Sequence, residues 1–520
     1  MRAVLLIAAL AACSDRVEGR APSEDEGQAV SARREADVTL AKAQFAEGVR
    51  VTEVALYQGT RVSLLLGGEA PTRAMPVVAG RDALVRAYVA PDAARIGTSV
   101  RGELYLVREG KTQRVFEETL LLAGPSREDT PATTLNFDVP GAELTPETRF
   151  LVRLVDAAAP ARPGATKTAA QAPPSGVPEP LRAERGAEKL RVVIVPVQYG
   201  ADGSNRLPDT SASIVDAIRK RLLEFYPVPE VVVTVREPVP FSVPISGTGP
   251  GWDEVLMTVT RARLTDRVAP DVYYYGAFAP AATLTGFCTG SCVLGLSGFA
   301  ESPADTAHRV SVGVLFPTSE SIDTVPHELG HGHGRDHAPC GRAGGVDAHY
   351  PYPGGLTGTW GYSVVTKTLQ PPSLFDQMSY CNPAWQSDYT YRGLFERLSA
   401  VARIPASAAP LTTGPGAARF RMLHVSDGAL AWYGEPFVTD AVLDGAKVPV
   451  EWLDDGGRVS AVRTAHAVRF TERSSGYLLV PYDGDEAFAR LRVARGIELA
   501  PAAMAWLLNA DAKAREISVR

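Results

Sequence analysis

Four of the chain's eight histidines fall within eleven consecutive residues, 327–337, whose sequence is HELGHGHGRDH. Residues four positions apart lie one above the other on an α-helix, so His327 and His331 would face the same way and could bind one metal ion. Glu328 would project about 100° round the helix axis from His327, beside the ion rather than on it. Two histidines and an acidic residue at these offsets are typical of a zinc peptidase site.

Gly334 and His337 extend this pattern beyond the end of the predicted helix. Glycine takes positive φ without strain and can end a helix, and the resulting turn would bring His337 back as a third ligand. Three neutral imidazoles leave the fourth zinc position to a water molecule, whose proton Glu328 could take. The alternative is a histidine-rich surface helix without a metal. His333 falls on another face, where we expect a solvated side chain or one that supports the ligands.

Pro326 directly precedes the first histidine of this motif. Proline breaks helix interiors because it lacks an amide hydrogen, but it is tolerated in the first turn, where amides have no partner within the helix. We therefore predict that the helix begins late, with Asp323 or Thr324 as its N-cap.

The pattern HExxHxxGxxH is the signature of the metzincin superfamily of zinc peptidases, and residues 327–337 match it without a gap. Metzincins share a tight turn with a methionine beneath the metal, and residues 376–381, DQMSYC, resemble this Met-turn with Met378. Tyr380 matches a tyrosine of astacins and serralysins, which implies a phenol that can bind zinc at rest and stabilise the oxyanion. Ordinary packing is the alternative for both Met378 and Tyr380. The resemblance covers residues 190–400.

The same resemblance suggests roles for residues near these motifs. Trp385 stands where metzincins build the wall of the pocket for the residue beyond the scissile bond, and a core aromatic is the alternative. The loop 341–373 could line the site or bind Ca²⁺ through Asp347, but no spaced set of acidic residues supports calcium. No cysteine between residues 14 and 287 could block the metal as the pro-segment of some metzincins does.

Apart from Cys13, the chain has four cysteines: Cys288, Cys292, Cys340 and Cys381. An even number in an exported chain suggests two disulfides, and the sequence leaves three pairings open. Closeness favours Cys288–Cys292, which leaves Cys340–Cys381. A zinc site of four thiols is the alternative, although it would lack a CxxC pair. A Cys340–Cys381 bond would connect the segment after the third histidine to the Met-turn.

The N-terminal segment MRAVLLIAALAAC has one positive charge, at Arg2, followed by an apolar run that is too short to span a bilayer. This pattern is typical of a secretory signal peptide. Residues 10–13, LAAC, resemble the lipobox of bacterial lipoproteins, which implies cleavage after residue 12 and lipidation of Cys13. An ordinary signal peptide is the alternative. We therefore expect export and a lipid anchor at the bacterial cell envelope, on the outer membrane or surface, with release as a further option.

The bulk composition excludes some classes of partner. A chain of 520 residues with 45% apolar and 22% charged residues is expected to fold into several domains. A net charge of −6 provides no basic face, so we expect no nucleic-acid partner. No later apolar run reaches the roughly 18 residues of a membrane span, so membrane contact is expected only through the lipid. Nothing in the sequence indicates an oligomeric state.

Changes of pattern along the chain predict the domain boundaries. After the signal peptide, residues 1–12, residues 13–45 lack apolar periodicity and are expected to be a tether. Residues 46–157 alternate apolar and polar, with a hairpin at Glu109–Gly110, and predict a β-sandwich. Residues 158–188 are rich in proline and alanine and predict a linker.

The rest of the chain divides into two further domains. Residues 189–405 alternate strand and helix patterns, whereas residues 406–520 return to strand patterning with Asp-Gly and Gly-Gly turns. The predicted fold is therefore multidomain: an α/β (α+β) metzincin-like catalytic domain with a mainly parallel twisted sheet, flanked by β-sandwich-like N- and C-terminal domains.

These features together predict a zinc-dependent endopeptidase that hydrolyses extracellular protein or glycoprotein substrates. One alternative is a non-catalytic surface adhesin that a metal stabilises. Glu328 argues against it, because a purely structural site needs the ligands and not the base. A second alternative is an amidase that acts on cell-wall peptides.

Overall fold

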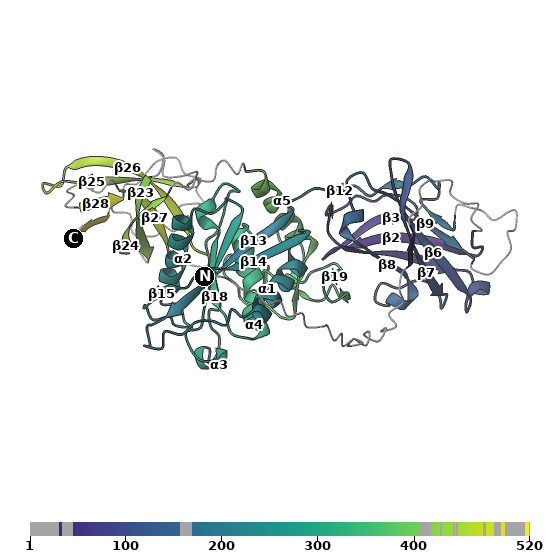
Figure 1. The fold of residues 1–520 in the computed structure, drawn as a ribbon, viewed down its shortest axis with the longest axis horizontal. Helices are drawn as coiled ribbons and strands as arrows, with labels where there is room; N and C mark the ends of the chain where they lie inside the picture. Colours follow the sequence, from purple (N-terminus) through teal and green to yellow (C-terminus); the bar gives the residue numbers. More distant parts are fainter. Residues whose placement is uncertain are drawn as a thin grey trace, which may run out of the picture.

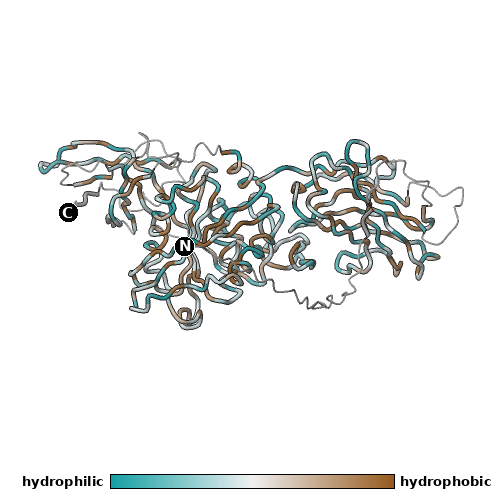
Figure 2. The backbone as a smooth tube through the Cα atoms, viewed as in Figure 1, coloured by the Kyte–Doolittle hydropathy of each residue, from teal (hydrophilic) through white to brown (hydrophobic). Residues whose placement is uncertain are grey.

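The computed structural model of the chain describes residues 31–33, 45–156, 169–404, 418–426, 429–439, 443, 446–471, 475–482, 490–493 and 515–518. The predicted signal peptide, Cys13 and most of the predicted tether lie outside these residues. A β-sandwich, a parallel sheet covered by helices and an antiparallel sheet follow one another along the molecule (Figure 1). Figure 2 shows hydrophobic residues concentrated along the strands of each part. Within the described residues, no helix has the length and apolar character needed to cross a membrane.

The N-terminal part consists of two antiparallel sheets packed face to face. The first has the strand order β1-β7-β6-β9-β10, with β11 beside β9, and the second has the order β3-β2-β5-β8. The bounds are β1 (Ser31–Arg33), β2 (Val49–Tyr57), β3 (Arg61–Leu66), β5 (Ala83–Pro91), β6 (Ser99–Arg108), β7 (Lys111–Leu121), β8 (Leu135–Val139) and β9 (Arg149–Val155). Side chains alternate along β2, so Val54 and Leu56 enter the core between the sheets, whereas Ala55 and Tyr57 lie on the opposite face in a second buried cluster. Two packed sheets are what the alternating pattern predicts.

The predicted hairpin is found between β6 and β7, where Arg108 pairs with Lys111. The two residues of its turn, Glu109 and Gly110, have φ values of 51° and 74°. Positive φ at both central residues matches the right-handed twist of the flanking strands. The hairpin prediction is therefore confirmed.

The prediction of a linker over 158–188 is wrong for residues 171–184. Three two-residue strands lie there: β10 (Gln171–Ala172), β11 (Glu179–Pro180) and β12 (Ala183–Glu184). The first two pair with β9, and β12 pairs with β4 (Val77–Val78). Edge strands this short need only backbone hydrogen bonds and show no apolar period in the sequence. For the same reason, the sequence did not indicate that β1, within the predicted tether, pairs with β7.

The middle part contains a sheet in the strand order β14-β13-β16-β18-β17. The bounds are β13 (Lys189–Tyr199), β14 (Glu230–Val235), β15 (Val239–Phe241), β16 (Val272–Phe278), β17 (Gly295–Ser297) and β18 (Val310–Val314). All pairs are parallel except β17, which runs antiparallel to β18. The mainly parallel sheet is confirmed, whereas β17 is too short to show in the sequence pattern.

Helices cover both faces of this sheet because successive side chains of β13 point to opposite faces. The helices are α1 (Ala212–Phe225), α2 (Trp252–Asp266), α4 (Ser319–Gly332) and α5 (Asp388–Ala402). Val192 and Ile194 share a core with α1 and α4, whereas Val195 and Val197 share one with α2. The histidine-bearing helix α4 is thus packed directly against the sheet.

The described C-terminal residues form one seven-stranded antiparallel sheet in the order β24-β23-β27-β26-β25-β28-β29. Its strands are β23 (Ala418–Ser426), β24 (Ala429–Thr439), β25 (Lys447–Leu453), β26 (Val459–Arg469), β27 (Gly476–Pro481), β28 (Arg490–Val493) and β29 (Arg515–Ser518). Phe420 and Met422 pack into the core around α2, whereas Leu423 and Val425 face a second core. One continuous sheet replaces the predicted sandwich-like arrangement, because alternation shows which strands have a buried face and not which strands pair.

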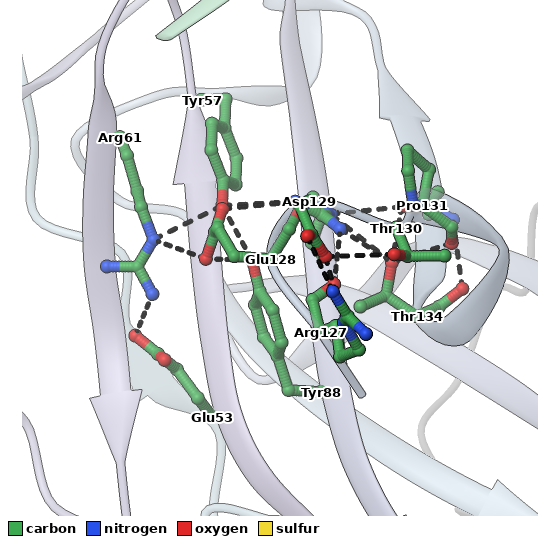
Figure 3. A network of polar contacts seen from close by, with 12 residues as sticks. Glu53, Tyr57, Arg61, Tyr88, Arg127, Glu128, Asp129, Thr130, Pro131 and Thr134 are labelled. Atoms are coloured by element: carbon green, nitrogen blue, oxygen red, sulfur yellow. Dashed lines mark hydrogen bonds and ion pairs between the residues drawn. The ribbon is translucent and has the colours of Figure 1, made fainter. Parts of the chain in front are cut away.

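A network of polar side chains joins the outer face of the β3-β2-β5-β8 sheet to the loop between β7 and β8 (Figure 3). Glu128 of this loop accepts hydrogen bonds from the hydroxyls of Tyr57 and Tyr88. The Glu128 carboxylate also pairs with Arg61 at 3.2 Å and with Arg86 at 3.1 Å. Because the Arg86 side chain is fully buried, Glu128 compensates its charge where water cannot. The network thereby holds the loop on the sheet.

Glu128→Ala should lower the free energy of unfolding by roughly 3 kcal/mol, because the buried Arg86 guanidinium would lose its counter-charge. Chemical unfolding curves would measure the loss. Asp129→Ala in the same loop is the matched control, since Asp129 pairs with the exposed Arg127 and its removal should leave the midpoint unchanged. Equal midpoints for the two variants would show that the network does not stabilise the fold.

Candidate metal centre

The helix that carries the histidines begins earlier than predicted. It starts at Ser319, the side chain of Thr318 caps its first turn, and Pro326 lies inside it. The prediction that Asp323 or Thr324 is the N-cap is therefore wrong.

The helix continues through Pro326 because its apolar face is buried. Val325 and Leu329 are fully buried, and Ile322 packs against the same core. Burial of these side chains offsets the hydrogen bond that proline cannot make. In addition, the carbonyl of Pro326 accepts a hydrogen bond from the Tyr226 hydroxyl at 3.0 Å.

Gly334 turns the chain after α4, as predicted. Its φ is +72°, and an added Cβ would lie 2.6 Å from the carbonyl oxygen of Ala300 and from the Arg397 guanidinium. Both the backbone conformation and the close packing therefore require glycine. The turn brings His337 back toward the helix, where its side chain meets the other two histidines.

The structure brings the three predicted ligands together. Nε2 of His337 lies 3.1 Å from Nε2 of His331 and 3.3 Å from Nε2 of His327. Each histidine has one ring nitrogen within 4.8 Å of those of the other two. His331 and His337 are almost fully buried.

Backbone carbonyls determine which ring nitrogen of each histidine carries the proton. The Nδ1···O distances are 2.7 Å from His327 to Gln377, 2.6 Å from His331 to Arg335 and 2.5 Å from His337 to Gly344. A carbonyl can only accept, so Nδ1 donates, and in a neutral ring Nε2 remains the acceptor. Burial, together with the neighbouring His327 and His337, holds the pKa of His331 well below its usual value, so this ring is neutral.

Acceptor nitrogens at this spacing fit a zinc ion. Zn–N bonds of about 2.0–2.1 Å in tetrahedral geometry separate the ligand nitrogens by roughly 3.3 Å. The observed separations of 3.1 and 3.3 Å agree with that value, whereas two acceptors this close would otherwise repel each other. Imidazole nitrogens are common ligands of zinc, whereas calcium prefers oxygen ligands such as carboxylates.

The candidate calcium ligand belongs to no comparable cluster. In the described part of the chain, the histidine triad is the only group of three or more His, Cys, Asp or Glu side chains placed to hold an ion. Asp347, the candidate calcium ligand, instead accepts a hydrogen bond from the Tyr389 hydroxyl at 2.7 Å. Its backbone amide donates to the carbonyl of His337 at 2.9 Å. Asp347 therefore holds the loop beside the third histidine.

Glu328 lies in the same helix and is 6% exposed. Its carboxyl group lies against Gly295 of β17, where an added Cβ would overlap it. The Ser311 hydroxyl of β18 donates to the backbone carbonyl of Glu328 at 3.1 Å. Burial, and secondarily the charge of Glu328, raises the pKa of Tyr275 well above its usual value. The edge of the sheet thus limits where the Glu328 carboxylate can point.

Residues 376–381 form a turn beneath the helix. Met378 is buried, and its sulfur occupies the place that a side chain on Gly330 would need. The Asp376 carboxylate accepts hydrogen bonds from the amides of Met378 (2.8 Å) and Ser387 (2.9 Å) and from the Ser387 hydroxyl (2.6 Å). Burial raises the pKa of this carboxyl group. Asp376 therefore fixes the turn whose next residue, Gln377, orients the first histidine.

Tyr380 and Trp385 lie in contrasting environments. The Tyr380 ring centre lies 4.8 Å from that of His337 and 5.8 Å from that of His327, and the residue is 44% exposed. Tyr380 is thus beside the triad and open to solvent, unlike an ordinary packed tyrosine. Trp385 is buried and packs against Phe225, which fits the alternative of a core aromatic.

Both predicted disulfides are present. Cys340–Cys381 joins the segment after His337 to the residue after Tyr380, and Cys288–Cys292 closes a loop before β17. The pairing favoured by closeness in sequence is therefore confirmed, and the alternative of a four-thiol zinc site is wrong.

His333 is fully buried, which excludes the solvated side chain and leaves the other expectation, a side chain that supports the ligands. Its ring stacks on Tyr273 with ring centres 4.2 Å apart, and its Nδ1 donates to the carbonyl of Leu329 at 2.6 Å. Burial lowers the pKa of His333 to about 3. The side chain supports α4 from behind and does not join the triad.

Sequence reasoning missed the groups that orient the ligands. Three of them are backbone carbonyls, which leave no signal in the residue types. Gly295 lies in a three-residue strand that the sequence did not predict. Asp376 was part of the recognised turn but had no assigned role. Of these groups, only Asp376 offered a signal, because an acidic residue at the start of a turn is a common acceptor for backbone amides.

His331→Ala should reduce bound zinc from one ion per chain to none, because two remaining imidazoles cannot close the site. Dialysis against zinc followed by elemental analysis would measure this. The control is His349→Ala, whose side chain is 90% exposed and which should keep the ion. Full zinc content in folded His331→Ala protein would show that the triad is not the metal site.

Comparison with known proteins identifies no family for this chain. No protein-family model matches it, and no curated protein matches it. The candidate centre itself offers three imidazole nitrogens, one carboxylate group and one phenol group.

Proposed function

We propose that this chain is a zinc-dependent endopeptidase. The observation that carries the proposal is the convergence of three Nε2 atoms, each on a ring whose Nδ1 is bonded to a carbonyl, with an acidic residue, Glu328, directly after the first of these histidines on the same helix. A structural zinc site fills all four positions with protein ligands, whereas three protein ligands are typical of a catalytic site. Glu328 is acidic and adjacent, which a purely structural centre would not require.

Each residue has a role that its position permits. His327, His331 and His337 would hold zinc, which when bound supplies a Lewis acid that lowers the pKa of a water molecule to about 7. Glu328 takes a proton from water as general base and returns it to the leaving amine as general acid. The Tyr380 hydroxyl donates to the oxygen that becomes negative as the peptide carbonyl is attacked.

The sheet edge favours an extended peptide as substrate. β17 is the last strand in the order of the described middle sheet, and its Gly295 touches Glu328. The amide and carbonyl of Ser297 on this edge are bonded to Thr471 at 3.2 and 2.9 Å, so an extended peptide would add at Gly295, where main-chain hydrogen bonds would hold it. Its backbone would then run past the carboxylate, which suits cleavage within a chain.

The N-terminal sequence and the disulfides support a location outside the cytoplasm, and an extracellular substrate would be the consequence. Two disulfides are typical of an exported protein. We propose an enzyme of metzincin type, anchored at the bacterial cell envelope through lipid on Cys13, that cleaves extracellular proteins or glycoproteins. An adhesin without turnover and an amidase that cleaves cell-wall peptides are the competing functions.

The purified chain, loaded with zinc, should be incubated with casein, with a peptide library and with peptidoglycan, each with and without a chelator. Zinc-dependent cleavage of casein and peptides supports the proposal. Release of peptides from peptidoglycan alone would instead indicate the amidase. A fully zinc-loaded chain that cleaves none of these substrates would favour the adhesin.

Glu328→Gln should lower kcat by about 10²–10⁴-fold, because the amide cannot accept the proton. Zinc content should remain at one ion per chain, since Glu328 is not among the ligands. Cleavage of a fluorogenic peptide and elemental analysis of the same sample would measure the two quantities. Undiminished kcat would exclude Glu328 as the base.

Tyr380→Phe should lower kcat by roughly 100-fold with little change in KM, because the lost hydroxyl acts only on the developing oxyanion. Steady-state kinetics on the same peptide would separate the two constants. Tyr105→Phe, which removes a hydroxyl bonded to Glu103 in the sandwich, is the control and should behave as wild type. A change in KM alone would assign Tyr380 to substrate binding.

A further inference from the structure

The turn between β2 and β3 of the sandwich is inserted into the middle part of the molecule. The carbonyl of Gly59 accepts hydrogen bonds from the Trp385 indole nitrogen at 2.8 Å and from the Tyr362 amide at 3.1 Å. The carbonyl of Gln58 accepts one from the Tyr391 hydroxyl. Three segments of the middle part therefore bind two consecutive carbonyls of one sandwich turn.

Gly59 is required by the closeness of this contact. Its φ is +116°, and an added Cβ would lie 2.9 Å from the Gln386 amide nitrogen and 2.9 Å from the Tyr391 ring. Any larger residue would separate the turn from the segment at 385–391.

Arg81 strengthens the same contact. This sandwich residue is 1% exposed, and its guanidinium donates to the carbonyls of Leu223 (2.5 Å) and Val228 (2.7 Å). Carbonyls at the C-terminal end of a helix such as α1 have no partner within the helix and attract a cation. Arg81 thus caps α1 from the neighbouring part.

Apolar packing is continuous across this contact. Tyr391 and Phe395 of α5 belong to the core of the sandwich. β19 (Gly361–Ser363) and β20 (Thr368–Gln370), from the loop before the Met-turn, form a hairpin whose Tyr362 packs on Tyr57 and Tyr88. Tyr57 and Tyr88 also bind Glu128 in the network of Figure 3, so that network anchors the sandwich side of the contact.

A short chain of contacts leads from this turn to the first metal ligand. Trp385 of β22 (Ala384–Trp385) pairs in register with Asp376 of β21 (Phe375–Asp376). Asp376 holds the turn that follows, and the carbonyl of Gln377 in that turn lies 2.7 Å from Nδ1 of His327. Gly59 therefore acts on His327 through three successive residues.

We infer that the N-terminal sandwich is a permanent support of the metal centre, and that Gly59, Trp385 and Asp376 are positioning residues for His327. The inference rests on the proposed zinc site but not on peptide hydrolysis. Groups that orient a metal-bound histidine typically contribute 10–100-fold to metal affinity or activity. If the sandwich were instead a removable pro-segment, weakening its contact with the middle part would leave the zinc affinity of the three histidines unchanged.

Gly59→Ala and Trp385→Phe test this inference in the full chain. Trp385→Phe removes the indole N–H and keeps an aromatic ring, so this variant still tests the inference if Gly59→Ala does not fold. Each should weaken zinc binding about 10-fold, measured by competition with a chromophoric chelator at a temperature well below melting. Val152→Ala, in the sandwich core far along the chain from this turn, is the control for lost stability and should keep wild-type zinc affinity.

The outcomes separate the inference from the proposed function. Wild-type zinc affinity in folded Gly59→Ala and Trp385→Phe would overturn the inference, whatever the activity. Weaker zinc binding in Val152→Ala as well would also overturn it, since general destabilisation would then explain the effect. A wild-type chain that binds zinc tightly but cleaves no peptide would contradict the proposed function. The zinc affinities of the variants would still test the support of His327.

Discussion

The candidate site depends on one constraint: three imidazole rings must direct their acceptor nitrogens at a single point. Each ring is oriented by a backbone carbonyl, and the three carbonyls come from the Met378 turn, the turn after α4 and the loop before Asp347. Without a cation the converging acceptors repel each other, so the arrangement is stable only if the surrounding structure holds it or an ion is bound. Both the disulfide at Cys340 and the buried Asp376 serve to hold it.

This constraint explains how the three parts of the molecule relate. The parallel sheet fixes α4 from one side, and the turn at residues 376–381 supports it from below. That turn is itself braced by the sandwich through Trp385. The C-terminal sheet packs on α2, on the other face of the middle sheet, and its residues 469–471 also reach the edge strand β17, where the Thr471 amide donates to the carbonyl of Ser297 at 2.9 Å. The contact that braces the turn at residues 376–381 comes from the N-terminal side of the molecule.

Local patterns predicted most of the elements that carry the site. The alternation of strands and helices over residues 189–405, the Glu109–Gly110 hairpin and both disulfides are found as expected. The errors share a cause. The start of α4, the strands within 171–184 and the single C-terminal sheet are all decided by partners distant in sequence, which supply the burial or the backbone hydrogen bonds. His333 is buried for the same reason, because Tyr273 lies against it.

The sequence by itself determined which side chains could hold an ion, that an acidic residue directly follows the first of them, and which glycine lets the third histidine return. These follow from residue type and helical spacing, which are local properties. Only the tertiary structure decided which nitrogen of each ring faces the other two rings, that Tyr380 is exposed beside the triad, and that a turn of the sandwich accepts a hydrogen bond from Trp385. The ring orientations and the contact with the sandwich both depend on backbone carbonyls. Since every residue has a carbonyl, no sequence pattern can reveal which of them will accept these hydrogen bonds.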